Sequence, residues 1–342
     1  SSSTSSSEKM ISTSLPPPDE PGLASFLRRV GLFLAPLVLG ALTLFTVPYP
    51  RAFAYRFVKG DCWGRGIWIE QRIDVSPVPV DVAFLGTSRT IHAIDDARIE
   101  ALLEKGGVSA HVVNLGYCRN GRNLHEVIAR DLLEAKDVKD LVIEVSDTEF
   151  GDSHPMFGYL ARTDDLLAER LRPNLDYARD LFHGLVGRFE RVRADVLPIA
   201  PPAPPGEIGL HGGAALPRVA EPEAMAAKRA KRRARAAAAP ERGREAFPRQ
   251  ALGALAKRAK DRGARLHFLY LPSYGEPWAR MANEDLYRAL GDVWIPPREI
   301  FDDPTHWMDP NHLNVEGARA LATWLAERIQ RLERSTPRGG GR

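Results

Sequence analysis

Cysteine is scarce in this sequence. Its 342 residues include two, Cys62 and Cys118, and neither has a histidine or a second cysteine at metal-ligand spacing. Two thiols cannot by themselves build a disulfide framework or a four-ligand zinc site. One disulfide between them is allowed in an oxidising compartment, and two free thiols are the alternative. We therefore expect no metal site and no cofactor.

An excess of one charge sign is also lacking. There are 47 Lys and Arg against 44 Asp and Glu, a net charge of +3 that by itself indicates no anionic partner. Six of the basic groups lie at residues 228–235, so the rest of the chain is 41 − 44 = −3. This run has no interleaved aromatics and favours a solvated helix or linker over a nucleic-acid or anionic-lipid site. We do not expect nucleic acid as a partner.

Long apolar runs are absent, with one exception. Residues 30–47 are eighteen consecutive uncharged residues, the lower limit for a membrane-spanning helix. A cleaved signal peptide with its exit site at residues 52–54 and a buried core helix are the alternatives. The run is long for a signal peptide and lacks the polar positions of a core helix. We expect one uncleaved transmembrane anchor over residues 28–48, which meets the lipid bilayer through residues 30–47.

Basic residues flank this run on both sides, which makes the charge rule for membrane orientation weak. Arg28 and Arg29 abut the run, and the tail before it is short, so we favour a cytoplasmic N-terminus. The remaining chain would then lie on the extracytoplasmic side of an inner membrane. Residues 1–27 are rich in Ser, Thr and Pro and predict a disordered tail, as do residues 335–342.

Beyond the anchor, strand and helix patterns alternate. Apolar segments predict strands at residues 80–85, 111–115, 141–145, 265–271 and 293–295. Helical periodicity lies between and after them, at residues 95–105, 123–135, 249–262, 284–290 and 318–332. This alternation predicts an α/β domain in which helices cover both faces of a parallel sheet.

The domain falls into two halves with an insert between them. The predicted parts are a juxtamembrane linker (49–77), a first half (78–158), a helical, Pro/Ala-rich and basic low-complexity insert (159–248) and a second half (249–334). Ligands of parallel sheets bind beyond the carboxyl ends of the strands. Candidate residues should therefore be sought just after the predicted strands.

Two such places carry residues suited to nucleophilic catalysis. Ser88 follows the first strand in Gly86-Thr87-Ser88, where glycine permits a tight exit from the strand. Asp309 and His312 lie three residues apart just before the last helix, with Asn314 as its expected N-cap. That spacing lets the carboxylate orient the imidazole, whose other nitrogen would serve as base for Ser88.

These motifs resemble those of the SGNH (GDSL-like) hydrolase superfamily, across residues 78–332 without 160–248. The resemblance implies a flavodoxin-like three-layer sandwich with a parallel sheet. It also implies that Ser88 is the nucleophile of a triad with His312 and Asp309. The backbone N–H groups of Ser88 and Gly116 would stabilise the oxyanion.

The sequence departs from the family pattern at two of its blocks. Gly-Asp-Ser is replaced by Gly86-Thr87-Ser88, and Gly-x-Asn-Asp is matched only by residues 145–148, so the usual oxyanion asparagine is missing. Asn120 or Asn123 is the candidate replacement. Because loss of one oxyanion donor costs about 10² to 10³ in rate, a weakened or specialised enzyme is expected.

Other nearby residues have weaker claims. Arg89, Ser273 and Tyr274 are candidates for lining the substrate site, although each also fits an ordinary role in a turn or at the surface. His92 and His306 lack a carboxylate three residues before them and are not expected to be the base. A literal Gly-Asp-Ser occurs at residues 151–153, but its place in the chain order is wrong for the nucleophile.

The expected function is that of a membrane-anchored serine esterase or O-acyltransferase. The arrangement is similar to that of SGNH-like proteins of bacterial envelopes, so an acylated envelope polymer, first of all a glycan, or a small ester is the expected substrate. The alternative is a catalytically inactive SGNH-like domain that binds a polymer or scaffolds an envelope complex.

Overall fold

The fold is taken from a computed structural model of the chain. It describes residues 22–57, 65–146, 149, 151–197, 209–236, 246–276, 281 and 283–335. Three parts of the chain lie outside the described residues. They are most of the two predicted disordered tails, Cys62, and the Pro-rich stretch after residue 197. The chain divides into two compact units, Ser1–Thr46 and Val47–Arg342.

The first unit contains one helix, α1 (Leu23–Leu44), with Pro36 inside it and no buried residue. The expected span was residues 28–48. Helix α1 begins before residue 28 and ends before residue 48, so Arg28 and Arg29 lie within the helix. Its 22 residues correspond to about 33 Å at 1.5 Å per residue. The helix is thus long and apolar enough to cross a membrane.

The second unit is built on a parallel sheet of five strands. They are β1 (Val82–Leu85), β2 (Val112–Asn114), β3 (Asp140–Val145), β4 (Arg265–Tyr270) and β5 (Asp292–Trp294). Their order is β2-β1-β3-β4-β5, and every pairing is parallel. The predicted α/β class with a parallel sheet is confirmed, and this order is one of the two common ones in doubly wound sheets.

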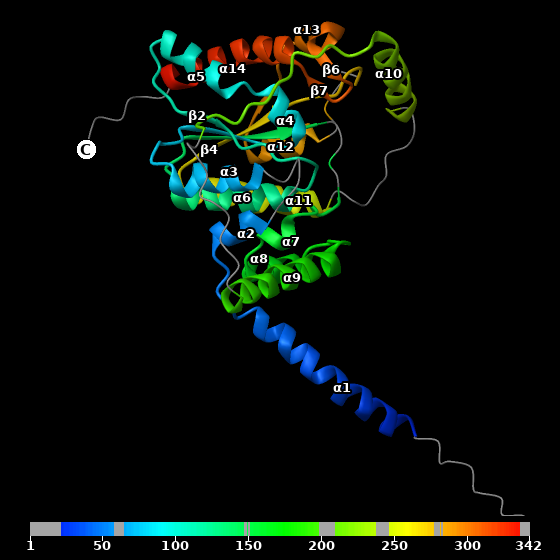
Figure 1. The fold of residues 1–342 in the computed structure, drawn as a ribbon. Helices are drawn as coiled ribbons and strands as arrows, with labels where there is room; N and C mark the ends of the chain where they lie inside the picture. Colours follow the sequence, from blue (N-terminus) through cyan, green and yellow to red (C-terminus); the bar gives the residue numbers. More distant parts are fainter. Residues whose placement is uncertain are drawn as a thin grey trace, which may run out of the picture. The chain divides into compact units, whose positions relative to one another are not determined.

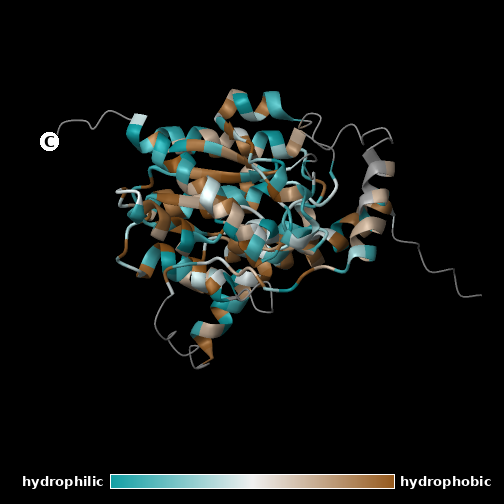
Figure 2. Cartoon of the chain, turned by 90° about the horizontal axis from the view of Figure 1, so that it is seen from above, coloured by the Kyte–Doolittle hydropathy of each residue, from teal (hydrophilic) through white to brown (hydrophobic). Residues whose placement is uncertain are grey.

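Helices cover both faces of the sheet (Figure 1). Helices α5 (Asp96–Lys105) and α14 (Val315–Ser335) pack together on one face, and α6 (Arg122–Ala135) and α11 (Ala246–Asp261) pack together on the other. The strands are largely buried, and Figure 2 shows them as apolar at the centre of the domain among helices of mixed character. This is the burial expected of strands covered on both sides.

Several short elements lie between these strands and helices. They are α4 (Ser88–Ala93), α12 (Glu284–Leu290), α13 (Glu299–Asp302), a 3₁₀ turn η2 (Pro304–His306), β6 (Trp307–Asp309) and β7 (His312–Leu313). The last two form a separate antiparallel pair. This pair was not expected, because two- and three-residue strands are too short to show an alternating pattern.

The expectation of a juxtamembrane linker over residues 49–77 is wrong. That stretch contains α2 (Arg51–Phe57), α3 (Arg65–Glu70) and a π-helical turn, η1 (Gln71–Val75). Tyr55 and Ile69 are fully buried. The segment is therefore part of the folded domain. Its helices are too short to produce a recognisable apolar period.

The predicted insert is helical in part but is not independent of the domain. It begins within α7 (Phe157–Leu160) and contains α8 (Thr163–Glu169), α9 (Tyr177–Val196) and α10 (Pro222–Ala236), the last of which carries the basic run. Residues 209–221 lie along the domain. The N–H of Ala214 donates to Ile91 O (2.9 Å), and the N–H of Val315 donates to Leu216 O (3.0 Å). This segment therefore links α4 to the start of α14.

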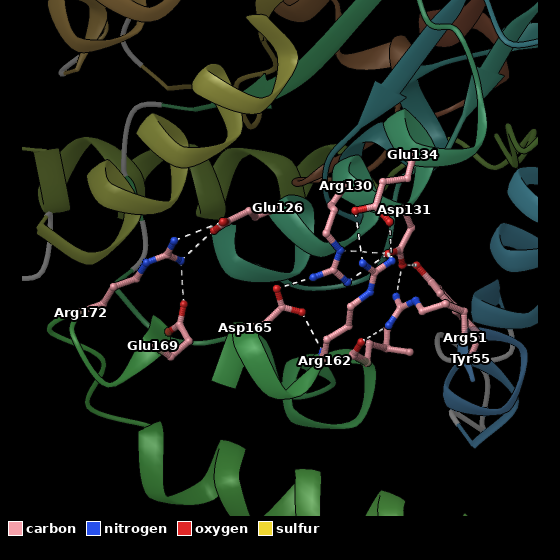
Figure 3. A network of polar contacts seen from close by, with 11 residues as sticks. Arg51, Tyr55, Glu126, Arg130, Asp131, Glu134, Arg162, Asp165, Glu169 and Arg172 are labelled. Atoms are coloured by element: carbon pink, nitrogen blue, oxygen red, sulfur yellow. Dashed lines mark hydrogen bonds and ion pairs between the residues drawn. The ribbon is translucent and has the colours of Figure 1, made fainter. Parts of the chain in front are cut away.

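A buried polar network fastens the additional helices to the sheet domain (Figure 3). Its centre is Asp131 of α6, whose side chain is only 3% exposed. The carboxylate of Asp131 pairs with Arg51 of α2, with Arg130 of α6 (3.0 Å) and with Arg162 at the start of α8 (3.4 Å). Tyr55 donates its hydroxyl to the same carboxylate at 3.1 Å.

Candidate active site

Ser88 is the first residue of α4, three positions after Leu85, the last residue of β1. Gly86 makes this sharp exit feasible, because a Cβ there would lie 2.0 Å from Thr90 Oγ1 and 2.5 Å from Glu144 Cβ. The side chain of Thr87 caps the helix by accepting from the N–H of Arg89. Ser88 thus lies at the carboxyl edge of the sheet, where the sequence predicted it.

A buried carboxylate holds this turn from beneath. Glu144 of β3 accepts hydrogen bonds from the N–H of Thr87 (2.7 Å), the N–H of Thr90 (3.2 Å) and the hydroxyl of Thr90 (2.6 Å). The hydroxyl of Thr87 donates to the same side chain at 2.9 Å. Sequence patterns do not point to Glu144, although an acidic residue inside an apolar strand is a signal of a buried polar contact.

Asp309 and His312 lie on the β6–β7 hairpin, directly opposite one another. Asp309 Oδ1 accepts from the N–H groups of Asn311 (2.7 Å) and His312 (3.1 Å), and so shapes the turn. Asn314 then caps α14, since its Oδ1 accepts from the N–H groups of Glu316 and Gly317 at 3.0 and 3.1 Å. The predicted N-cap is confirmed, and it fixes the hairpin to a long helix.

The three predicted triad residues meet in one hydrogen-bonded chain. His312 Nε2 lies 2.8 Å from Ser88 Oγ, and His312 Nδ1 lies 2.7 Å from Asp309 Oδ2. Ser88 and His312 are 224 positions apart in the sequence. The fold therefore brings together a hydroxyl, an imidazole and a carboxylate in the order that nucleophilic catalysis requires.

Electrostatics favour an ionised Asp309. Burial opposes its charge, but the hydrogen bonds from the His312 side chain and from the N–H groups of Asn311 and His312 outweigh burial and lower the pKa of Asp309. The ionised carboxylate accepts a hydrogen bond at Oδ2 from Nδ1 of His312, so Nδ1 carries the proton. That tautomer leaves the lone pair of Nε2 directed at the hydroxyl of Ser88.

The other candidate histidines occupy different positions. The ring of His92 lies 5.0 Å from that of His312, edge to face, and its Nδ1 donates to Ala214 O (2.7 Å). Burial lowers the pKa of His92, so it is neutral at neutral pH beside the candidate base. His306 donates Nδ1 to Ile300 O at 2.8 Å instead. Neither histidine takes the place of His312 between Ser88 and Asp309.

The literal Gly-Asp-Ser motif serves a structural purpose. Ser153 is buried and accepts from the side chain of Asn123 at 2.6 Å. His154, which follows it, donates Nε2 to Cys118 O at 2.7 Å, and burial lowers its pKa to about 4. Because Asn123 is bound to Ser153, its predicted role as oxyanion donor has no support in the structure.

The N–H of Gly116 is also engaged in a hydrogen bond. Its N–H, expected to face the oxyanion, donates to the side-chain oxygen of Asn114 at 3.0 Å. Among the described residues, none accepts from the N–H of Ser88, which leaves that donor available. Asn120 is exposed and lines a polar cavity together with Thr87, the neighbour of Ser88. Ser88 and Asn120 are thus the predicted oxyanion donors that remain.

This cavity contains groups that the sequence did not single out. Its lining consists of Thr87, Asn120, Gly121, Arg122, His125, Glu144, Ser146 and Glu149. Arg122 pairs with Glu149 (2.7 Å) and donates to Glu144 O (2.8 Å). Burial and the Arg122 cation hold the pKa of His125 well below its usual value. The cavity is therefore lined by a fixed ion pair and a neutral imidazole.

Two of the three predicted substrate-lining residues, Arg89 and Tyr274, make hydrogen bonds that connect the segments of the candidate site. Arg89 donates Nη1 to Leu271 O (3.0 Å), just beyond β4. Tyr274 donates its N–H to Pro310 O (3.0 Å), in the turn between Asp309 and His312. Ser273 is buried, and its hydroxyl has no hydrogen-bond partner among the described residues. The loop after β4 thus contacts both α4, which carries Ser88, and the β6–β7 hairpin, which carries His312.

Cys118 is disulfide-bonded, and the other cysteine of the sequence, Cys62, lies outside the described residues. Within the described residues, no group of three or more His, Cys, Asp and Glu side chains could hold a metal ion.

No family model matches the chain, and no curated protein matches it either.

Proposed function

We propose that the protein is a membrane-anchored serine esterase or O-acyltransferase of the SGNH type. The observation that carries this proposal is the hydrogen-bonded chain from Ser88 through His312 to Asp309. The strand order supports the SGNH-like sandwich expected from the motifs. So do the positions of Ser88 after β1 and of the β6–β7 hairpin, with His312, before the last helix. The proposed substrates are acyl esters of a cell-envelope glycan or a similar compound.

In the first half of the proposed reaction, Ser88 Oγ attacks the ester carbonyl carbon while His312 Nε2 takes the hydroxyl proton. Asp309 stabilises the imidazolium that forms. Collapse of the tetrahedral intermediate breaks the ester C–O bond, and His312 returns the proton to the leaving oxygen. The products of this half are an alcohol and an acyl ester of Ser88.

In the second half, the O–H of an acceptor attacks the acyl ester while His312 takes its proton. The bond between the acyl carbon and Ser88 Oγ then breaks, and His312 returns the proton to Ser88. Water as the acceptor gives hydrolysis, and a sugar hydroxyl gives transfer. The oxyanion in both halves would receive hydrogen bonds from the N–H of Ser88 and from the side chain of Asn120. Hydrogen bonds of this kind act on charge that develops only in the transition state.

The proposed location is the extracytoplasmic side of the inner membrane. Helix α1 is apolar and long enough to serve as the anchor. The disulfide at Cys118 supports an oxidising compartment, because disulfides are rare in the cytosol. An anchored enzyme in that compartment would act on polymers close to the membrane.

A fluorophosphonate probe tests the proposal directly. The full-length protein in detergent should be labelled at Ser88, and the Ser88→Ala and His312→Ala variants should lose labelling. Ser153→Ala is the matched control, since this serine belongs to the literal Gly-Asp-Ser motif and should leave labelling intact. Labelling of Ser88→Ala at the rate of the unmodified chain would refute the assigned nucleophile.

One observation favours a second candidate, a catalytically inactive SGNH-like binding or scaffold domain. Two of the predicted oxyanion donors, Gly116 and Asn123, are bound to other acceptors. A folded protein with a sharp thermal transition that resists both the probe and activated esters would support this candidate. The same protein should then retain affinity for an envelope polymer.

A further inference from the structure

The inward side of α9 is polar. Its buried residues are Asp180, Gly184, Gly187 and Arg188. Asp180 accepts from the side chain of Asn174 at 2.9 Å, and Arg188 donates to Gly184 O at 3.0 Å. A surface helix of a water-soluble domain normally turns an apolar face inward, so this arrangement is reversed.

The outward side of α9 is apolar. Phe182, Phe189 and Val196 recur every seven residues, which places them along one side of the helix, roughly opposite the buried residues. Their exposed fractions are 63%, 55% and 73%. We call these three residues the α9 stripe. Further exposed leucines lie in and just after α8 and at the end of α9, namely Leu167, Leu171, Leu175 and Leu197. Exposed apolar surface of this extent marks an interaction site.

The chain that follows α1 is fastened to this helix. Tyr49 lies five positions after Leu44, the last residue of α1 (49 − 44 = 5). The guanidinium of Arg188 lies over the ring of Tyr49 at 4.9 Å, and that of Arg191 lies over Phe53 at 5.4 Å. Five residues extend over at most about 18 Å. A bilayer crossed by α1 would therefore lie within that reach of α9.

The charged residues beside the stripe are mostly paired with one another. Arg179 pairs with Asp176 at 3.1 Å, and Arg193 pairs with Glu190. Residues 163–197 contain six arginines and seven acidic residues, which gives no positive excess for anionic headgroups. The stripe therefore suits the apolar part of a membrane interface, and its binding should depend little on salt.

We propose that α9 lies in the membrane interface, with Phe182, Phe189 and Val196 immersed in it, as a membrane contact additional to α1. The proposal rests on the proposed membrane span and is independent of the proposed catalysis. Helix α9 and the elements that carry the triad, α4, β6 and β7, lie at opposite ends of the domain (Figure 1). A domain held in this way would keep its candidate site facing away from the bilayer.

Photolabelling from lipid tests this contact. The full-length protein is placed in nanodiscs of a zwitterionic phospholipid with a small fraction carrying an acyl-chain diazirine, irradiated and mapped by peptide mass spectrometry. Peptides from residues 177–197 should be labelled together with those from α1, at low and high salt alike. Labelling of α1 alone, with residues 177–197 no higher than peptides containing exposed Ile295, would overturn the proposal.

Variants distinguish specific lipid contact of the α9 stripe from non-specific labelling of exposed apolar residues. The double variant Phe182→Ser and Phe189→Ser should lose labelling in α9 and keep it in α1, while Ile295→Ser should change neither. Both phenylalanines are more than half exposed, so the thermal transition should be retained. If α9 is unlabelled and the double variant instead converts a dimer to a monomer, the stripe binds a second copy and the membrane proposal is wrong. Catalysis is read separately, by the fluorophosphonate probe.

Discussion

Asp309 serves two purposes with its two oxygens. Oδ1 accepts from backbone N–H groups and shapes the turn, whereas Oδ2 faces His312 Nδ1 at 2.7 Å. An asparagine of the same shape could keep the first role and lose the second. Its amide would present a donor to Nδ1 and thereby favour the tautomer in which Nε2 carries the proton.

Asp309→Asn should therefore separate fold from catalysis. We expect kcat on an activated ester to fall by a factor on the order of 10⁴, as when the carboxylate of a serine triad is made neutral. The thermal transition should change little, because the Oδ1 contacts with the turn are retained. A variant with undiminished kcat would show that Asp309 does not orient the base.

At the scale of elements, the turn between β1 and α4 depends on β3. The register pairs Leu85 with Ile143, so Glu144 lies beside the residues that follow β1. Four hydrogen bonds to this one side chain hold both Thr87 and Thr90 around Ser88. Glu144 is a positioning residue, because it holds the turn without contacting Ser88 or His312.

Glu144→Gln replaces one acceptor oxygen by an NH₂ group and should loosen this turn. We expect kcat to fall by about 10², the effect of a displacement near 1 Å in a catalytic group, with KM little changed. The fluorophosphonate labelling rate should fall in parallel. Glu327→Gln is the control, since its side chain is 59% exposed on α14. A loss of stability with unaltered kcat would assign Glu144 a structural role only.

Sequence patterns predict the strands and helices of the parallel-sheet domain well and the elements added to it poorly. All five strands lie where apolar runs place them, and the predicted helix at residues 284–290 has the bounds observed. Ser88, Asp309 and His312 could be found because their motifs are local. Glu144 stands out only as an acidic residue in an apolar strand, and its role could not be predicted because its partners follow another strand and become neighbours only through sheet register. Residues 49–77 were missed because no apolar period is recognisable in their sequence.

At the scale of the whole molecule, two chain segments converge on α6 (Figure 3). The segment after α1 contributes Arg51, the insert contributes Arg162, and α6 itself contributes Arg130 and Asp131. The side chains of Arg130 and Asp131 are each 3% exposed. A buried cation without its partner is costly, so Asp131 couples the additional helices to the sheet.

Asp131→Asn should uncouple these segments while leaving the candidate site in place. Removing one partner of a buried ion pair costs about 3–5 kcal/mol, and the free energy of unfolding should fall by that amount. Glu134→Gln is the matched control, because Glu134 pairs with the same Arg162 but is 35% exposed, where a pair contributes about 0–1 kcal/mol. Urea unfolding of the full-length variants in detergent measures both values.

Hydrogen exchange locates the effect of Asp131→Asn. Amides of α2 and of α7 to α9 should exchange faster than in the unmodified chain, while those of β1, β3 and α14 stay protected, because only the former depend on the network for attachment. Fluorophosphonate labelling of Ser88 should persist at low temperature. Uniformly faster exchange across the sheet would contradict this, since it would mean that the network stabilises the domain as one cooperative unit.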